Sequence, residues 1–368
     1  MSYKIALVPG DGIGPEIVVE AVKILKAIGD KFGHEFIFQE YLAGGVAIDK
    51  FGVPIPDETV KGCRDSEAIL FGSVGGPKWD DLPWDNVNTA ITPSRGIQIL
   101  RREFQLYANL RPAQANPYLE SISPLKAEKL RGVDVMVVRE QCAGLYFGEP
   151  RGIVTEDGVR RGINTESYTE KEVERVARKA FDIAMTRRRK QVTSVDKHNV
   201  LESSRLWREV VVEVARDYPE VKLNHMYADN AALQLVLRPE QFDVILTGNI
   251  FGDILSDLTA CYHGSLGMMP SASLGDGNFG LFEPIHGTAP DIAGKNIANP
   301  LSQILSAKMM LEYSFGLQKE AAAIESAIDT VLKEGFRTPD LYTPGCRKTS
   351  TEEMGDLIAK AIQETQFQ

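Results

Sequence analysis

The sequence predicts an α/β protein of two domains. Its 368 residues are too many for one ordinary core and too few for three. Strand-like apolar runs alternate along the chain with segments of helical periodicity, which is typical of a largely parallel sheet with helices on its faces. Hydrophobic residues at 43% and charged residues at 25% are ordinary for a soluble globular protein.

The first predicted unit is a strand at 5–8 followed by a glycine turn and a helix. The turn reads PGDGIGPE at 9–16, and Pro15 suits the first turn of the helix that follows. Further strands are predicted at 34–41 and 68–72, with a glycine-rich loop and a short helix between them. This alternation indicates an α/β domain.

The rest of the chain continues in the same style. Strands are predicted at 133–138, 191–195, 221–227 and 242–247. Helices are predicted over 170–185, from Pro300 onward, and in a further segment up to Gly335. Glycine, proline and acidic residues crowd 264–300, which favours binding loops over regular elements.

Composition limits the partners and the compartment. A net charge of −10 disfavours a nucleic-acid partner, because phosphates would be repelled over most of the surface. No apolar run approaches the ~20 residues of a membrane span, so no membrane partner is expected. The four cysteines are scattered, and the first residues enter a strand without a cleavable signal. We therefore expect a cytoplasmic protein with reduced thiols.

Two aspartates four residues apart give a chemical signal. Asp253 and Asp257 lie in TGNIFGDILSD at 247–257, and a helix would place them on one face, one turn apart. Like charges in this register repel unless a cation lies between them, and carboxylate oxygens suit Mg²⁺ or Mn²⁺. Apolar neighbours disfavour a merely solvated face. Asp229, at a strand end, is either a further ligand or a helix N-cap.

Basic and phenolic side chains form a second set of candidate residues, for substrate binding and proton transfer. Arg101, Arg111 and Arg139 suit a di- or tricarboxylate substrate, although ordinary ion pairs are the commoner fate of an arginine. Lys197 follows a strand and acts as a base if its pKa is lowered. Tyr146, between glycines, offers a phenolic proton. Taken singly, the last two residues are more commonly an exposed lysine and a packed tyrosine without a catalytic role.

Glycine-rich segments suggest ligand-binding loops. The turn Gly10-x-Gly12-x-Gly14 is not the GxGxxG of a Rossmann fold and lacks the P-loop lysine, so it is either a ligand contact or a tight connection. In the irregular loop that follows Phe282, His286 either contacts an adenine or holds the loop. Asp291 suits a ribose hydroxyl, as acidic residues do in NAD sites.

Taken together, six motifs resemble the isocitrate/isopropylmalate dehydrogenase family of metal-dependent β-decarboxylating dehydrogenases. They are PGDGIGPE at 9–16, FGSVGGPKWD at 71–80, YANLRP at 107–112, SVDKHNVL at 194–201, TGNIFGDILSD at 247–257 and EPIHGTAPDIAG at 283–294. The motifs are long, ordered and spread over most of the chain, which argues against a chance match.

This resemblance implies a two-domain α/β subunit that is not a standard Rossmann fold. One domain, 1–106 plus 264–368, would contain both termini and bind the cofactor. The other, 107–263, would bind substrate and metal and form the contacts of a homodimer.

The reaction implied is the NAD-dependent oxidative decarboxylation of (2R,3S)-3-isopropylmalate to 4-methyl-2-oxopentanoate, a step of leucine biosynthesis. Asp229, Asp253 and Asp257 would hold Mg²⁺ or Mn²⁺. Lys197 would remove the hydroxyl proton, and Tyr146 would protonate C3 after CO₂ is lost. The active site would be shared, with Lys197 and Asp229 from one subunit and the other two aspartates from its partner.

Substrate and cofactor contacts follow from the same resemblance. Asp229 and the three arginines Arg101, Arg111 and Arg139 would contact the malate, and Ile97 and Gln98 would meet its substituent. The expected cofactor residues are Ile13, Gly75, Gly76, Glu283, His286, Gly287, Thr288, Ala289, Asp291, Ile292 and Asn299. Asp291 and Ile292 stand where NADP-dependent relatives carry a cation and a tyrosine, so NAD is expected.

Three stretches depart from the family pattern. Gln98 replaces a leucine and Ser94 a glutamate, and a buried amide without a partner costs about 1–3 kcal/mol. The turn at 141–143 differs, and the loop between Trp79 and Pro93 is longer than usual. Three alternatives stay open: the same chemistry on another 3-alkylmalate, D-malate or tartrate; a non-catalytic regulatory subunit; and a phosphate-binding module built on the N-terminal glycine turn.

Overall fold

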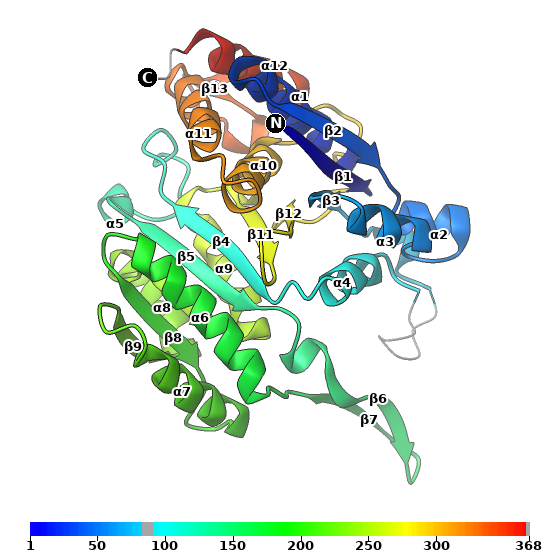
Figure 1. Cartoon of the computed structure of the whole chain (residues 1–368), viewed down its shortest axis with the longest axis vertical. Coiled ribbons are helices and arrows are strands. Elements are labelled where there is room, and N and C mark those ends of the chain that lie inside the picture. The colour runs from blue at the N-terminus through cyan, green and yellow to red at the C-terminus, as the bar shows by residue number, and fades with distance from the viewer. Residues whose placement is uncertain (83–90, 366–368) are drawn as a thin grey trace. The chain divides into compact units, whose positions relative to one another are not determined.

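The structure, a computed structural model, describes residues 1–82 and 91–365 (Figure 1). These residues divide into two compact units. Within the described residues the first unit comprises 1–82, 91–104 and 264–365, and the second comprises 105–263. Most of the long loop expected between Trp79 and Pro93 falls on 83–90, outside the described residues.

The first unit is built on five strands. They are β1 (Ser2–Gly10), β2 (Glu35–Glu40), β3 (Ala68–Ser73), β11 (Pro270–Leu274) and β12 (Gly280–Pro284). Their order is β2-β1-β3-β12-β11. All neighbours are parallel except β11 and β12, which are antiparallel. This arrangement is not the order of a standard Rossmann fold.

Helices from both ends of the chain complete the first unit. They are α1 (Gly14–Phe32), α2 (Gly45–Phe51), α3 (Asp57–Arg64), α4 (Pro93–Glu103), α10 (Leu301–Tyr313), α11 (Gln318–Lys333) and α12 (Thr351–Glu364). The apolar stripe of α1 is buried, as its periodicity predicted. The carboxyl-terminal end of α1 contacts α12 (Figure 1). There Lys31 Nζ donates to the carbonyl oxygens of Ile362 (2.6 Å) and Gln363 (3.0 Å).

The second unit has five strands in the order β4-β5-β10-β8-β9. They are β4 (Ala108–Gln114), β5 (Asp134–Glu140), β8 (Gln191–Asp196), β9 (Lys222–Tyr227) and β10 (Val244–Thr247). The first two are antiparallel and the remaining neighbours are parallel. The helices are α5 (Ala127–Leu130), α6 (Glu170–Thr186), α7 (Glu202–Ala215), α8 (Ala228–Leu237) and α9 (Asn249–Thr259). A capping box of Thr169 and Glu172 begins α6.

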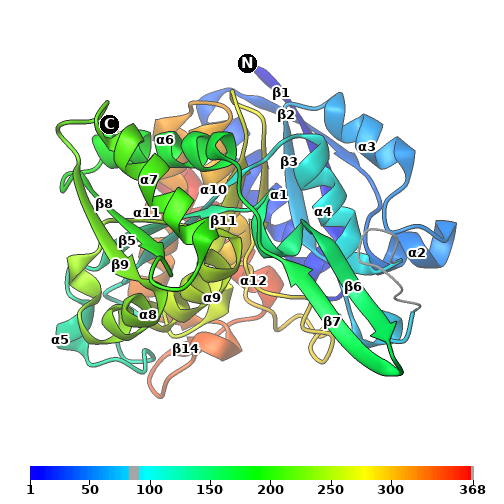
Figure 2. The same ribbon diagram turned by 90° about the horizontal axis from the view of Figure 1, so that it is seen from below.

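Smaller elements complete the description. The hairpin of β6 (Gly148–Glu156) and β7 (Val159–Thr165) projects as an arm from the rest of the second unit (Figure 2). Short strands β13 (Phe336–Arg337) and β14 (Arg347–Lys348) pair with each other. The 3₁₀ turns are Pro77–Trp79, Gly144–Tyr146, Pro239–Gln241, Ala260–Tyr262, Leu266–Met268 and Pro339–Leu341. Across the described ranges, no helix combines the length and the apolar character that crossing a bilayer requires.

The predicted α/β fold is confirmed, with one wrong expectation about the stretch 264–300. That stretch contains β11 and β12, although its composition favoured loops. Both strands are five residues long and every residue in them is buried. Burial on both faces removes the polar–apolar alternation of a half-buried strand, and prolines at Pro270 and Pro284 mark the strand ends. The sequence pattern therefore gave no strand signal.

Candidate functional site

Asp253 and Asp257 lie one turn apart on α9, facing two buried arginines from β4 and β5. Arg139 Nη1 donates to Asp253 Oδ1 at 2.6 Å. Arg111 Nη1 lies 3.4 Å from the Oδ1 atoms of both Asp253 and Asp257. Because Arg111 is only 5% exposed and Arg139 only 2%, their cations act in a medium of low polarity. They offset the repulsion between the two carboxylates.

The pairing of β4 with β5 brings these arginines together. Asn109 lies opposite Arg139 in the register, and its side-chain oxygen accepts from Arg111 Nε at 2.7 Å. At the start of α9, Asn249 Oδ1 accepts from Arg139 Nη2 at 2.7 Å. A Cβ at Gly252 would lie 2.5 Å from the Arg139 side chain. Glycine at that position is therefore needed for the arginine to lie along the helix.

Tyr146 joins the same cluster. Its hydroxyl donates to Asp253 Oδ2 at 2.8 Å, and the Arg139 guanidinium carbon lies 5.6 Å from its ring centre. Burial, and then the negative charge of Asp253, raises the pKa of Tyr146 above its ordinary value. The phenol consequently keeps its proton near neutral pH and can give it to a basic carbon or oxygen.

Lys197 and Asp229 form a separate pair. Lys197 Nζ donates to Asp229 Oδ1 at 2.7 Å, and this bond lowers the pKa of the Asp229 carboxyl. Tyr227 takes the N-cap position of α8, so the alternative of Asp229 as the N-cap is wrong. Over the described residues of this single chain, no three Asp, Glu, His or Cys side chains come together as a metal site. Asp229 therefore does not join Asp253 and Asp257 within one chain.

Helix α4 carries the predicted contacts to the substrate substituent. Ile97 is buried and Arg101 Nη2 donates to Glu283 Oε1 at 2.7 Å. Gln98 is half-buried, and its side-chain oxygen lies 3.5 Å from Arg95 Nη1. The Gln98 amide thus meets both water and a polar neighbour, so it does not bear the full cost of a buried unpaired amide.

A cavity of about 610 Å³ in the first unit collects many of the predicted cofactor residues. Its lining residues are Ile13, Leu266, Gly267, His286, Gly287, Ala289, Ile292, Ile297, Asn299, Pro339 and Asp340. His286 Nε2 lies 2.8 Å from Ser302 Oγ, and burial lowers the pKa of His286, which favours the neutral ring. The lining is largely apolar with a few polar groups, as in many small-molecule sites.

The other predicted cofactor residues lie outside that lining. Glu283 and Thr288 are buried, and Thr288 accepts from the Ile13 backbone N–H at 2.9 Å through its carbonyl oxygen. Asp291 is exposed on the same loop. Gly75 and Gly76 have φ values of +125° and +150°, which only glycine adopts readily.

Comparison with known proteins identifies the family of the chain. Residues 4–358 match the family model described as isocitrate/isopropylmalate dehydrogenase. The chain belongs to the isocitrate/isopropylmalate dehydrogenase family. The prediction that it is an enzyme of this family is confirmed.

Several members of the family resemble this chain over nearly its full length. The 3-isopropylmalate dehydrogenase of Aquifex aeolicus is 56% identical over 98% of this chain and 97% of the relative. That of Clostridium acetobutylicum is 55% identical over 97% and 98%. Among solved structures, isocitrate dehydrogenase from Methylococcus capsulatus gives a TM-score of 0.86 at 36% identity, covering 98% of this chain and 100% of that one.

Sequence reasoning missed the role of Asp11, which holds together the glycine-rich turns of the first unit. The buried carboxylate of Asp11 accepts backbone N–H bonds from Gly45 (2.7 Å), Val46 (2.8 Å) and Gly75 (2.9 Å). It therefore ties the PGDG turn to α2 and to the glycine segment. Its motif was recognised, but nothing in a sequence distinguishes a buried aspartate with backbone partners from a solvated one.

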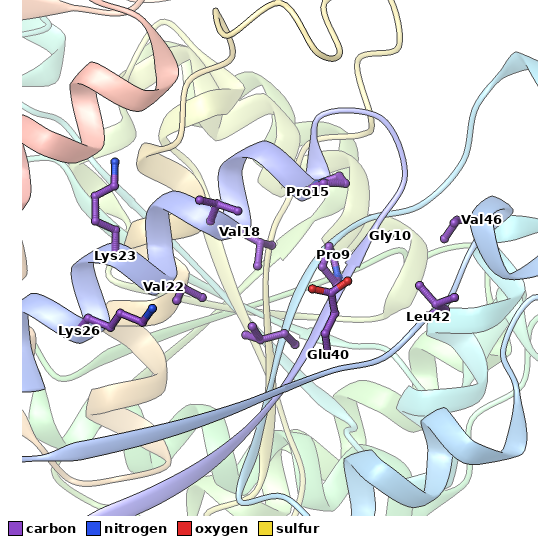
Figure 3. Close-up of a pocket in the computed structure, with 12 residues that line it drawn as sticks. Pro9, Gly10, Pro15, Val18, Val22, Lys23, Lys26, Glu40, Leu42 and Val46 are labelled. Atoms are coloured by element: carbon purple, nitrogen blue, oxygen red, sulfur yellow. The ribbon is translucent and has the colours of Figure 1, made fainter.

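A second cavity, of about 520 Å³, includes Gly10 of the glycine turn but none of the residues predicted to bind the substrate, the metal or the cofactor. It lies between α1 and the segment after β2 (Figure 3). Val18 and Val22 of α1 line it together with Leu42, while Lys26 and Glu40 supply charged groups. It is a mostly apolar groove of the first unit.

Proposed function

We propose that the chain catalyses the oxidative decarboxylation of (2R,3S)-3-isopropylmalate to 4-methyl-2-oxopentanoate in leucine biosynthesis, with NAD and Mg²⁺ or Mn²⁺. The observation that carries this proposal is the cluster of Asp253, Asp257, Arg111, Arg139 and Tyr146. It offers carboxylate oxygens for a hard cation, cations for a dicarboxylate and a phenolic proton. Relatives called 3-isopropylmalate dehydrogenase, at 53–56% identity, support the choice of substrate.

The aspartates fit a divalent metal ion. The side chain of Asp257 is 56% exposed and that of Asp253 is 36% exposed, so both can be reached from solvent. Their oxygens are the donors that Mg²⁺ and Mn²⁺ prefer, and Asp229 of the partner subunit would supply the third carboxylate. A bound ion would act as a Lewis acid on the 2-hydroxyl and the neighbouring carboxylate of the substrate.

The arginines of the proposed site bind the substrate, and its lysine and tyrosine transfer protons. Arg101, Arg111 and Arg139 hold the substrate carboxylates through paired N–H donors. Lys197 would take the proton from the 2-hydroxyl, and NAD, when bound, would supply the acceptor for the hydride of C2. Tyr146, kept protonated by burial and by Asp253, delivers a proton to C3 after CO₂ departs.

Cofactor binding is assigned to the domain of 1–106 plus 264–368. The cavity lined by Ile13, Ile292 and Asn299 supports this assignment, because apolar walls and a few polar groups suit a flat heteroaromatic ring. The neutral ring of His286 adds a further stacking or hydrogen-bonding surface.

The incomplete acid cluster and exposed apolar side chains support the proposal of a homodimer. We assign the dimer contacts, with substrate and metal, to 107–263. There Leu233 and Leu237 of α8 and Ile254 of α9 are 54%, 48% and 62% exposed. Large apolar groups gathered near functional residues are typical of interaction surfaces. The net charge of −10 and the four free cysteines fit a cytoplasmic enzyme without a nucleic-acid partner.

A substrate panel tests the proposed function. NADH formation is followed with NAD and Mg²⁺ or Mn²⁺ on 3-isopropylmalate, 3-methylmalate, malate, tartrate and isocitrate. The highest kcat/KM is expected for 3-isopropylmalate. A higher value for another acid would reassign the substrate. No NADH from any of them, with NAD and metal both bound, would indicate a regulatory subunit instead.

Substitution of Gln98 probes the substituent contact. Gln98→Leu is expected to raise kcat/KM for 3-isopropylmalate relative to malate by about 3–10-fold, because a leucine there adds apolar contact worth ~1 kcal/mol. The exposed neighbour Ser94 on the same helix gives the control Ser94→Ala, which leaves the ratio unchanged. A ratio unaffected by Gln98→Leu would exclude this residue from the substrate pocket.

Substitution of Asp291 probes cofactor choice. Asp291→Lys is expected to shift the ratio of kcat/KM for NAD over NADP toward NADP by ~10–100-fold, because a carboxylate repels a 2′-phosphate and an ammonium attracts it. Asp30→Lys makes the same charge change at an exposed position of α1 and should leave the ratio near its original value. An unchanged NAD preference in Asp291→Lys would contradict the assignment.

A further inference from the structure

Glu140 is a fully buried carboxylate at the end of β5, between Arg139 and the turn that leads to Tyr146. Its Oε1 accepts the backbone N–H of Cys142 and its Oε2 that of Ala143, each at 2.9 Å. One side chain thus satisfies two successive amides of the turn. A carboxylate can accept both bonds at once, whereas an amide or a protonated acid offers only one suitable oxygen on that side.

The other side of the turn is held by Asn249 of α9. Asn249 Nδ2 donates to the carbonyl oxygen of Ala143 at 2.9 Å, and Asn249 Oδ1 accepts from Arg139. Gly144 has a φ of +72°, and a Cβ there would lie 2.1 Å from the Tyr168 hydroxyl oxygen. The turn is therefore clamped between a carboxylate and an amide, with no room for it to shift toward Tyr168.

We propose that the carboxylate of Glu140 is a positioning residue for Tyr146: by holding the turn at 142–143 it places the Tyr146 hydroxyl on Asp253. The inference rests on the proposed function, in which Tyr146 gives its proton to C3. Glu140 itself touches neither Asp253 nor any other predicted metal ligand among its described contacts. Its effect on the reaction is carried by the backbone of the turn.

The surroundings of Glu140 make this clamp sensitive to pH. Arg175 Nη2 of α6 lies 3.9 Å from its Oε1, the charge of Glu172 opposes ionisation, and the Tyr168 hydroxyl and the Cys142 thiol group belong to neighbouring titratable residues. Burial dominates and raises the pKa of Glu140 to about 7. Below that pH the added proton removes one acceptor from the turn. Activity should therefore rise as pH increases through about 7.

The decisive variant is Glu140→Gln, which keeps the size of the side chain and removes its charge. We expect kcat to fall by ~10–100-fold. KM for the malate should change by less than about 3-fold, since the Arg139 bonds to Asn249 and Asp253 remain. In the pH profile of kcat, the fall in activity below about pH 7 that comes from protonation of Glu140 should disappear. In a Tyr146→Phe background, Glu140→Gln should cause little further loss, because the two residues act as a unit.

Two measurements distinguish a positioning role of Glu140 from a general loss of stability of the fold. Asp243 is another buried carboxylate that accepts a backbone N–H, from Gln191 at 3.1 Å, and Asp243→Asn should lower Tm while kcat is unchanged. Amide hydrogen exchange of 141–147, compared at one pH, should be ~10-fold faster in Glu140→Gln than in the wild type. Exchange does not depend on the substrate, so it tests the clamp even if the panel of acids refutes the proposed function. Unchanged exchange, or an equal loss of kcat in the Tyr146→Phe background, would overturn the proposal.

Discussion

Asp257→Asn is expected to lower kcat/KM by at least ~10³-fold, because one carboxylate that would hold the divalent ion becomes a neutral amide. Affinity for Mn²⁺, measured by calorimetry, should weaken by ~10–100-fold. Stability should change little, since the Asp257 side chain is 56% exposed and its contact with Arg111 is 3.4 Å long. Activity is read as NADH formation in saturating metal.

The control for this substitution lies on α6. Asp182 is exposed and accepts a hydrogen bond from the Tyr218 hydroxyl at 2.8 Å. Asp182→Asn makes the same chemical change away from the acid–arginine cluster and should retain full activity and metal affinity. Full turnover of Asp257→Asn, or of the wild type after a chelator removes every divalent ion, would refute the metal assignment.

Two inactive variants are expected to restore each other when they form mixed dimers. Lys197→Met removes the proposed base and Asp257→Asn removes a metal ligand, so each homodimer should be inactive. If Lys197 of one subunit works with Asp257 of the other, each mixed dimer contains one intact site and one doubly altered site. Purified mixed dimers should then have about one half of the wild-type activity, and an unpurified random mixture about one quarter.

A second pair of variants serves as the negative control for the mixed-dimer experiment. Lys197 and Asp229 are bonded within one chain, so they belong to the same half of any shared site. Mixing Lys197→Met with Asp229→Asn alters one residue in each of the two sites and should restore nothing. The dimers are obtained by co-expression with two different affinity tags. Absence of activity in purified Lys197→Met/Asp257→Asn dimers would show that each site is formed by a single chain.

Local sequence patterns predicted most of the fold. The helical face of α1 and the strands β1, β3, β5, β8, β9 and β10 follow from the spacing and clustering of apolar residues. The pattern failed for β11 and β12, since strands buried on both faces carry no alternation. Their partners lie elsewhere in the chain, and only the assembled sheet explains why those short segments are extended.

The candidate site was predictable where its residues lie close together in the sequence. Asp253 and Asp257 are one helical turn apart, and a single helix brings them together. The meeting of Arg111 with Arg139 depends on the antiparallel register of β4 and β5, which the sequence does not reveal. Asp11 and Glu140 went unrecognised for another reason. Their partners are backbone amides, and those donors are the same whatever residue carries them.

The position of β12 has a consequence for synthesis on the ribosome. This strand lies between β3 and β11, and α12 covers α1. The amino-terminal part of the chain therefore cannot finish folding until the last hundred or so residues of the chain have been synthesised. The central segment 105–263 has the strands β4, β5, β8, β9 and β10 in one continuous stretch, so these strands can pair with one another while the rest is still being translated. Until residues 280–284 emerge, β3 presents an open strand edge to the crowded cell. We therefore expect nascent chains of this enzyme to pass through a stage in which the central segment is folded while β3 still lacks its neighbour β12.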